Sequence, residues 1–292
     1  MMGFIRYRNI IDPLNGPISK VTAWQQKHPL LGDYFESVAS LLPELCPPKS
    51  TDIYAHGAGG GASKSKITAV HKAISEALER WAFFHVSLNE TNQKTILLLD
   101  TDPTSTGFAC HPSYISCATR KKSHEEAVER WSIYNWWIGK LPARILTQNE
   151  CNLQIEIMSP FDNLKVFCCA SKGERGFYIY GFSAADSLER AKSQALIEQN
   201  RNERALSKFP PDQVPRFRCD KRLFYFSTEE GFAQFNENLE KSLLLRSFPE
   251  RPRKLVDREV KGPWTKYARV WRTLYEGGEV WHHSASEKIF LF

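Results

Sequence analysis

Three segments of the chain space their apolar residues three and four positions apart, which is the repeat of an amphipathic helix. The apolar stripe of the first helix consists of Ile67, Val70, Ile74, Leu78 and Trp81. A second helix is predicted over residues 123–138 and a third over residues 187–208, where Pro210 and Pro211 would end it. Residues 228–244 carry a weaker helical pattern.

Short apolar or alternating runs between these helices indicate β-strands. Residues 95–100 are typical of a buried strand. Residues 153–158 and 164–170 alternate, and the Asp162-Asn163 pair between them suggests a hairpin. Residues 177–182 complete the predicted strands.

The two ends of the chain are less regular. Residues 1–50 form an entry segment that ends in a turn-rich stretch, whereas the last thirty residues are aromatic and mixed and predict no element. The strands and helices lack the regular rhythm of a doubly wound sheet, so the fold class predicted is α+β. We expect one domain over residues 1–292, with the motifs within 12–208 and an unassigned part at 209–292.

Composition excludes several classes of protein. A 42% hydrophobic share over 292 residues is ample for a core, so wholesale disorder is excluded. The longest apolar runs are too short to span a bilayer. The net charge of +6 is spread among charges of both signs and indicates no particular partner. Seven cysteines without a CxxC pair indicate no zinc ribbon and favour free thiols in a reducing cytoplasm.

A glycine-rich segment, residues 56–64, precedes the first helix and is predicted to be a loop. It is not a Walker A loop, because Ala58 and Ser63 stand where that motif requires glycines. A flexible turn is the simpler interpretation. Glycines and Lys64 directly before a helix N-terminus are nevertheless suited to approach a phosphate.

One helical segment is repeated. Residues 76–81, EALERW, recur as residues 126–131, EAVERW, and residues 198–201 give a looser version. Glu followed four residues later by Arg stabilises a helix by about 0.2–0.5 kcal/mol without any function. The helical repeat predicts that Glu76, Glu79 and Arg80 lie opposite the apolar stripe. Carboxylates gathered from several helices would suit Mg²⁺, and arginines would suit phosphate.

These segments, in their order along the chain, resemble the YcaO family. The similar segments are residues 12–18, 61–80, 107–131 and 187–201. The resemblance implies a YcaO-like fold of mixed or antiparallel sheets with packed helices that enclose a nucleotide site. It also implies an enzyme that uses ATP and Mg²⁺ to phosphorylate a backbone amide oxygen of a peptide.

The resemblance further implies the products and partners. A neighbouring Cys, Ser or Thr would close to an azoline, as in thiazole and oxazole biosynthesis by cyclodehydratases, or an external nucleophile would give a thioamide or amidine. Such chemistry matures ribosomally synthesised peptides, antibiotics among them. We therefore expect a precursor peptide substrate, a leader-binding, E1-like partner protein, and either a heteromeric complex or a homodimer, without membrane association and in the cytoplasm.

The resemblance assigns site residues by position but no catalytic residue. The Mg²⁺ ligands it implies are Glu76, Glu79, Glu126 and Glu129. The ATP-binding residues it implies are Lys64, Glu76, Arg80, Arg130, Glu198 and Arg201.

Two other functions remain open. A non-catalytic scaffold with the same fold is motivated by departures from the family pattern at Lys72, Thr106, His111 and Arg201. A basic nucleic-acid-binding protein is motivated by the +6 charge and the many aromatic residues, although no binding motif supports it.

Overall fold

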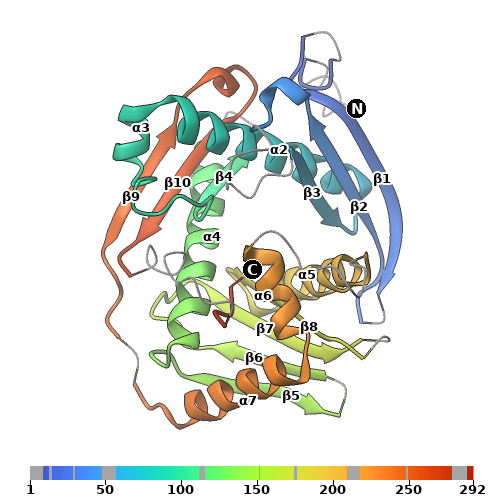
Figure 1. Ribbon diagram of the computed structural model, residues 1–292, viewed down its shortest axis with the longest axis vertical. Helices are drawn as coiled ribbons and strands as arrows, with labels where there is room; N and C mark the ends of the chain where they lie inside the picture. The colour runs from blue at the N-terminus through green and yellow to red at the C-terminus, as the bar shows by residue number, and fades with distance from the viewer. Residues whose placement is uncertain are drawn as a thin grey trace. The chain divides into compact units, whose positions relative to one another are not determined.

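A computed structural model of the chain describes residues 9–12, 15–28, 30–47, 57–111, 116–150, 152–173, 176–208, 218–247, 249–277 and 288–291 (Figure 1). The chain forms two compact units, each built from two stretches of sequence. Unit 1 consists of Met1–His124 and Leu255–Leu274, and unit 2 of Glu125–Lys254 and Tyr275–Phe292. The expected single domain over residues 1–292 stays a prediction.

Unit 1 holds two three-stranded sheets, ordered β1-β2-β3 and β4-β10-β9. Their strands are β1 Ile18–His28, β2 Gly32–Leu41, β3 Ala58–Ser63, β4 Phe108–His111, β9 Lys254–Val260 and β10 Arg269–Tyr275. The helices of this unit are α2 Lys66–Asn89 and α3 Thr91–Ile96, with 3₁₀ turns at Pro43–Leu45 and Pro263–Lys266. The helix α4, Ser116–Trp137, begins in this unit and continues into unit 2.

Helix α2 is the centre of unit 1, because it packs against β2 and β3 of one sheet and against β4 of the other. The Ser65 side chain accepts a hydrogen bond from the Thr68 N–H and caps its N-terminus. Ile74, Leu78 and Trp81 are buried in the core of the unit, as the apolar stripe predicted. Ile67 departs from that stripe, since it is 57% exposed.

Unit 2 is built on one antiparallel sheet of order β5-β6-β7-β8. Its strands are β5 Ala143–Asn149, β6 Asn152–Ile157, β7 Lys165–Lys172 and β8 Tyr178–Ala185. Its other helices are α5 Leu188–Lys208, α6 Arg218–Phe226 and α7 Glu229–Leu244. Helix α5 packs on β7 and β8, close enough that a Cβ atom on Gly181 would lie 2.0 Å from the Ala195 carbonyl oxygen.

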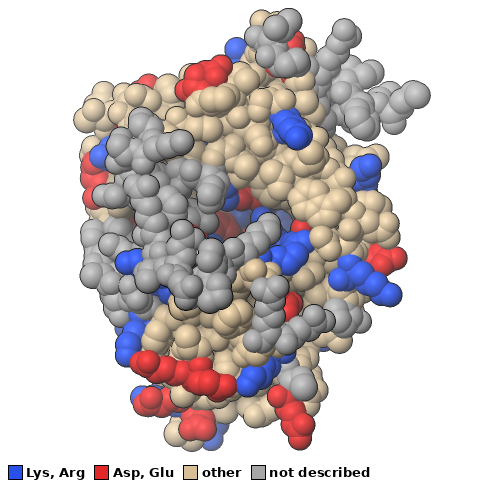
Figure 2. Space-filling view, turned by 45° about the vertical axis from the view of Figure 1, so that its right-hand side comes forward, with Lys and Arg blue, Asp and Glu red and all other residues tan. Residues whose placement is uncertain are grey.

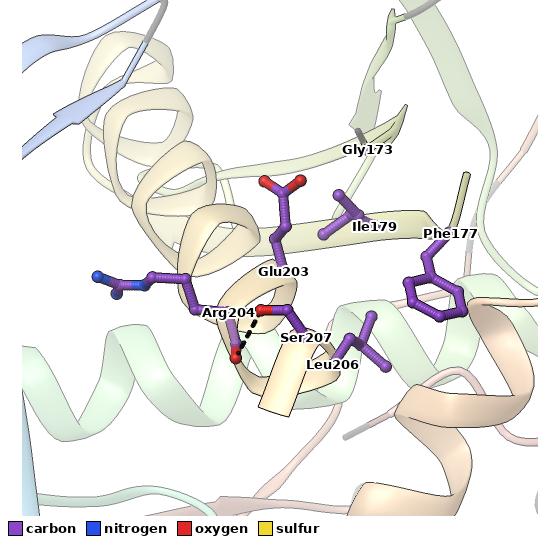
Figure 3. Close-up of a pocket in the computed structure, with 7 residues that line it drawn as sticks. All are labelled: Gly173, Phe177, Ile179, Glu203, Arg204, Leu206 and Ser207. Atoms are coloured by element: carbon purple, nitrogen blue, oxygen red, sulfur yellow. Dashed lines mark hydrogen bonds between the residues drawn. The ribbon is translucent and has the colours of Figure 1, made fainter. Parts of the chain in front are cut away.

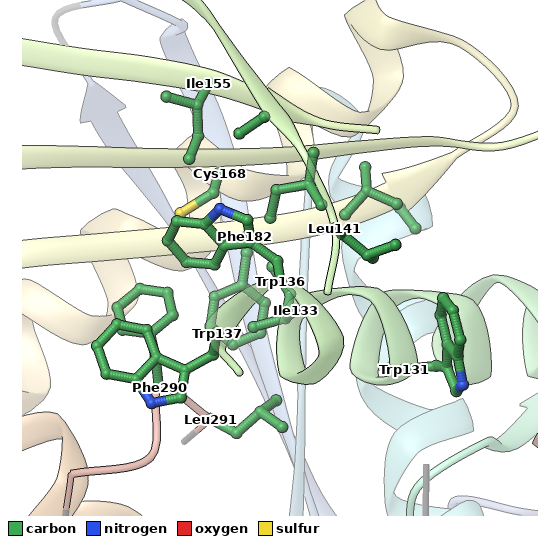
Figure 4. Packing of buried hydrophobic residues seen from close by; sticks show 14 of the residues in the cluster. Trp131, Ile133, Trp136, Trp137, Leu141, Ile155, Cys168, Phe182, Phe290 and Leu291 are labelled. Carbon is green, nitrogen blue, oxygen red and sulfur yellow. The ribbon is translucent and has the colours of Figure 1, made fainter. Parts of the chain in front are cut away.

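Aromatic side chains fill the core of unit 2 (Figure 4). Trp136 and Trp137 of α4 meet Phe290, which is fully buried although it lies near the end of the chain. The backbone carbonyl of Lys288 accepts a hydrogen bond from the Trp137 indole. Phe290 and Leu291 are therefore part of this core.

The α+β class, the antiparallel sheets and the helices at residues 187–208 and 228–244 are confirmed. So are the strands near 153–158, 164–170 and 177–182 and the hairpin between the first two. The helix predicted at 123–138 begins earlier, at Ser116. The predicted proline stop after α5 and parts of the segments at 12–18 and 47–50 lie outside the described residues.

Two expectations, the strand at 95–100 and the loop at 56–64, were wrong. Residues 95–100 are not a strand, because α3 extends to Ile96 and a turn follows in which Leu98 has φ of 56°. Leu97 and Leu99 are buried in that turn, so a short apolar run did not distinguish a strand from a buried turn. The entry segment contains β1 and β2, and residues 58–63 form β3 rather than a loop.

The expectations about membrane spans and cysteines can be compared with the described residues only. Within the described ranges, no helix is both long and apolar enough to cross a membrane. The six cysteines that the structure describes are all free thiols.

Candidate functional site

The two copies of the repeated segment both lie on α-helices, as predicted, but in different units. The first copy, residues 76–81, belongs to α2 in unit 1. The second, residues 126–131, belongs to α4 in unit 2, together with the looser copy at 198–201 on α5. The predicted site residues therefore form two groups.

In unit 1, Glu76 and Arg80 bind the free edge of β3. Arg80 Nη2 donates to Glu76 Oε1 at 2.6 Å, while Glu76 Oε2 accepts from the Gly60 N–H at 3.0 Å. A second guanidinium nitrogen of Arg80 donates to the Ala58 carbonyl. Because β3 is the last strand of its sheet in the part of the chain that the structure describes, the pair satisfies backbone groups that a further strand would otherwise bind.

This contact places the Glu76 and Arg80 side chains against a strand. They were expected opposite the apolar stripe, and they are only 29% and 25% exposed. Helical periodicity describes one helix in isolation, whereas α2 is covered on more than one side. The salt bridge that the four-residue spacing of Glu76 and Arg80 predicts is present, and the Glu76 carboxylate also accepts a hydrogen bond from the Gly60 N–H.

The glycines of β3 are explained by packing. A Cβ atom on Gly59 would lie 2.2 Å from the Ala77 backbone nitrogen, and one on Gly61 would lie 2.1 Å from the Ala69 carbonyl oxygen. A residue with a side chain at position 59 or 61 would therefore push α2 away from β3. The segment interpreted as a flexible loop is a strand whose glycines allow a helix to approach closely.

Lys64 and Glu79 complete the predicted residues of unit 1. Lys64 follows β3 directly, and its exposed ammonium group donates to the Leu31 carbonyl between β1 and β2. Glu79 is half-buried near Cys110. Burial, and then the Glu79 charge, raise the pKa of the Cys110 thiol well above its usual range, so this thiol is not an activated nucleophile.

In unit 2, Glu126, Glu129 and Arg130 form one ionic group on α4. Arg130 Nε lies 3.3 Å from Glu126 Oε1 and 3.9 Å from Glu129 Oε1. The Glu129 side chain is only 13% exposed, and it accepts a hydrogen bond from the Ala184 N–H of β8 at 3.3 Å. The Arg130 guanidinium also lies over the Phe182 ring, 5.5 Å from its centroid.

Glu198 of α5 adds a third carboxylate to this group. Its Oε2 accepts from Arg201 at 3.1 Å, and both side chains are partly exposed. The pKa of Glu129 is raised well above its usual range, mainly by burial and then by the neighbouring charges of Glu126 and Glu198. Arg130 and the Ala184 N–H oppose this rise only in part.

The same carboxylates shift the pKa of Arg130. Burial by itself would lower its pKa, but Glu126 and Glu129 outweigh burial and raise it. The Arg130 guanidinium therefore stays charged. The neighbouring Glu129 carboxyl resists ionisation, because its pKa is raised. Unit 2 therefore contains a group of acidic residues that an additional cation would stabilise.

The donor chemistry of this group fits Mg²⁺, which prefers carboxylate oxygens. No three His, Cys, Asp or Glu side chains among the described residues are arranged so that they could hold a metal ion by themselves. Mg²⁺ does not require such a cage, because it keeps several waters and binds through one or two carboxylates together with substrate phosphates. The residues of unit 2 are therefore compatible with a metal brought in with a nucleotide.

Sequence reasoning missed two contributors to this group. Ala184 contributes only its backbone N–H, which no residue pattern reveals. Phe182 was assigned to a strand, but alternation could not show that its ring lies beneath Arg130. Both lie on β8, so a sequence-based search of the helices alone could not find them.

Comparison with known proteins supports the fold. No family model matches the chain, and no curated protein matches its sequence. A solved structure of YcaO from Methanopyrus kandleri, bound with AMPPCP and Mg²⁺, is similar with a TM-score of 0.55. The similarity covers 92% of this chain and 88% of that chain at 13% sequence identity. The chain therefore has a YcaO-like fold, as the ordered motifs predicted.

Proposed function

We propose that this protein binds ATP with Mg²⁺ and uses it to activate a backbone amide of a peptide. The main support is the acidic group of unit 2, in which Glu129 is buried beside other carboxylates. The second support is the similarity of the fold to a YcaO that was solved with AMPPCP and Mg²⁺. Either observation alone is weaker, because acidic helices and shared folds are both common.

The residues of unit 2 have distinct roles in this proposal. Glu126 and Glu129 would hold Mg²⁺. Glu198 would contribute to the ATP site, while Arg130 and Arg201 would bind phosphate oxygens. When bound, Mg–ATP supplies a phosphoryl group that turns the amide oxygen, a poor leaving group, into a good one. The Phe182 ring and the Glu126 carboxylate hold the Arg130 guanidinium in place before any ligand binds.

The unit 1 residues are part of the same proposal on weaker grounds. The resemblance assigns Lys64, Glu76, Glu79 and Arg80 to the nucleotide or its metal. Glu76 and Arg80 already bind β3, so their role would include holding the position of that strand. Lys64 is exposed, and it would have to leave the Leu31 carbonyl to reach a phosphate.

The reaction and partners are proposed from the resemblance. We propose azoline formation by a Cys, Ser or Thr of a precursor peptide, or attack by an external nucleophile to give a thioamide or amidine. A leader-binding, E1-like partner would deliver the peptide, and this chain would act in a heteromeric complex or as a homodimer. The proposed setting is the cytoplasm and the maturation of ribosomally synthesised peptides.

A non-catalytic scaffold is the second candidate, and one observation favours it. The Glu76–Arg80 pair is bound to the backbone of β3, so these two residues have a structural use that does not require a nucleotide. A scaffold with this fold would keep that contact while losing turnover. This alternative predicts no phosphate release from ATP, even with peptide and partner present.

Nucleic-acid binding has less support. On the face drawn in Figure 2, Lys and Arg side chains are interspersed with Asp and Glu, and the described residues there form no continuous basic patch. Binding to an oligonucleotide rests on the net charge of +6 and the many aromatic residues, without a recognised binding motif.

Isothermal titration calorimetry with AMPPCP and Mg²⁺ tests the proposal. We expect saturable binding by the wild type and at least tenfold weaker binding by Glu129→Gln, which keeps the side-chain shape but removes the charge. The matched control is Glu237→Gln, since Glu237 is 65% exposed on α7 and pairs only with Lys241 among the described residues. Equal affinity in the wild type and Glu129→Gln would remove the proposed metal site.

A further inference from the structure

Unit 2 contains a cavity of about 250 Å³ at the C-terminal end of α5, beside the start of β8 (Figure 3). None of its lining residues is assigned above to ATP or Mg²⁺, although Glu203 lies two positions after Arg201 on α5. Its lining residues are Gly173, Phe177, Ile179, Glu203, Arg204, Leu206 and Ser207. The cavity is therefore a second candidate site, with its own chemistry.

The walls of the cavity are largely apolar. Ile179 and Leu206 are buried, and Phe177 is partly exposed beside them. Gly173 provides part of the space, because a Cβ atom there would lie 2.4 Å from Ile179 Cδ1 and 2.6 Å from Glu203 Oε1. A ligand in this cavity would thus contact hydrocarbon on more than one side.

Among the described residues, Glu203 is the one acidic group that lines the cavity. In Figure 3 its carboxylate points toward Gly173 and Ile179, whereas the Arg204 guanidinium points away from it. Glu203 is half-buried and has no hydrogen-bond or ion-pair partner within the part of the chain that the structure describes. A partly buried carboxylate beside apolar walls would be stabilised by a cation that donates hydrogen bonds.

The size of the cavity limits the ligand. An apolar cavity of about 150 Å³ accepts one benzene molecule, and cofactor pockets begin near 300 Å³. This cavity is thus large enough for one long side chain and too small for a nucleotide. A cationic head on an aliphatic stem matches it, because such side chains lay the stem on apolar surface and keep the charge near a polar group.

We propose that this cavity binds the side chain of a lysine or arginine residue in a peptide. The stem would lie against Ile179 and Leu206, and the charged head would donate to the Glu203 carboxylate. The face of the Phe177 ring would lie against the charged head or the aliphatic stem of that side chain. The identification of that peptide as the substrate rests on the proposed function, whereas binding of the side chain itself does not.

Methyl NMR of the full chain, with the isoleucine δ1 groups labelled, tests this proposal, and an Ile179→Val variant assigns the reporter signal. The probes are Nα-acetyl-arginine methylamide and Nα-acetyl-lysine methylamide, titrated without nucleotide. Nα-acetyl-norleucine methylamide is the uncharged control. We expect a saturable shift of the Ile179 δ1 signal with at least one cationic probe, and at least tenfold weaker binding of the norleucine probe.

Two variants locate the interaction. Glu203→Gln should weaken the cationic probe at least tenfold, and Gly173→Ala should do the same by filling the cavity. Glu189→Gln is the matched control, because Glu189 is exposed in the first turn of the same helix, and it should bind like the wild type. An unmoved Ile179 signal, or equal binding by Glu203→Gln, would overturn the proposal. Calorimetry with Mg–AMPPCP is independent, so a failure of the nucleotide site would leave this result intact.

Discussion

A buried ion pair in unit 1 offers the sharpest test of the packing described above. Arg272 of β10 and Asp102 are both 0% exposed, and Arg272 Nη2 lies 2.9 Å from Asp102 Oδ2. The same guanidinium donates to the backbone carbonyls of Leu97 and Asp102 at 2.6 and 3.1 Å. It also lies over the Phe108 ring, 5.1 Å from the centroid.

Asp102→Asn removes the compensating charge and leaves the guanidinium buried. Burial already lowers the pKa of Arg272 to about 10 although Asp102 opposes this, so the site is costly for a cation. Removing one partner of such a pair destabilises a protein by about 3–5 kcal/mol. For a chain of this size each kcal/mol lowers the unfolding midpoint by about 2–4 °C, so we expect a fall of at least about 6 °C.

Unfolding by heat and by urea, each followed by tryptophan fluorescence, measures the midpoint temperature and the free energy of unfolding, since Trp264 and Trp81 are buried in the same unit. Asp100→Asn is the matched control, because Asp100 is 52% exposed in its pair with Lys94 and should contribute far less to stability. If Asp102→Asn unfolds at the same urea concentration as Asp100→Asn, the buried Arg272–Asp102 pair does not stabilise unit 1 as we infer.

Three further predictions use other parts of the fold. Gly59→Ala should lower the unfolding free energy by more than about 2 kcal/mol, because its Cβ would lie 2.2 Å from the Ala77 nitrogen; a thermal midpoint equal to wild type would contradict this. Phe290→Ala should destabilise by about 3–5 kcal/mol in urea, whereas Leu244→Ala, at a residue 75% exposed, should change stability by less than about 0.5 kcal/mol. Glu129 binds its proton more tightly in the folded than in the unfolded chain, so stability should fall as pH rises from about 4.5 toward its raised folded pKa. Urea unfolding across that range should show a smaller fall in Glu129→Gln, and identical pH profiles would refute the burial of this carboxylate.

The helices show how much of this protein could be predicted locally. Helix α5 matches residues 187–208 within one residue, because a repeat of three and four residues arises whenever one side of a helix is buried. Strands with an alternating pattern, such as β6 and β7, were found for the same reason. Strand β1 was missed, because most of its side chains are exposed and an edge strand needs no apolar alternation.

The candidate site could be predicted only in part. The repeat at 76–81 and 126–131 identified acidic residues on helices, because a repeated pattern is a property of the sequence itself. The repeated pattern could not show that the two copies have different partners. In the structure, Glu76 of the first copy accepts a hydrogen bond from β3, whereas Glu129 of the second copy accepts one from β8. Those partners lie 16 and 55 residues away along the chain, respectively.

The amino-acid sequence alone therefore determined the four longer helices, α2, α4, α5 and α7, but not α3 or α6. It also determined which helices carry carboxylates and arginines, and the order of motifs that resembles YcaO. Only the tertiary structure decided that the glycines of β3 serve helix packing, that Glu129 is buried among like charges, and that a cavity forms beside Glu203. The physical reason is that periodicity reports burial within one element, whereas the charge state and partners of a side chain depend on residues brought close by folding.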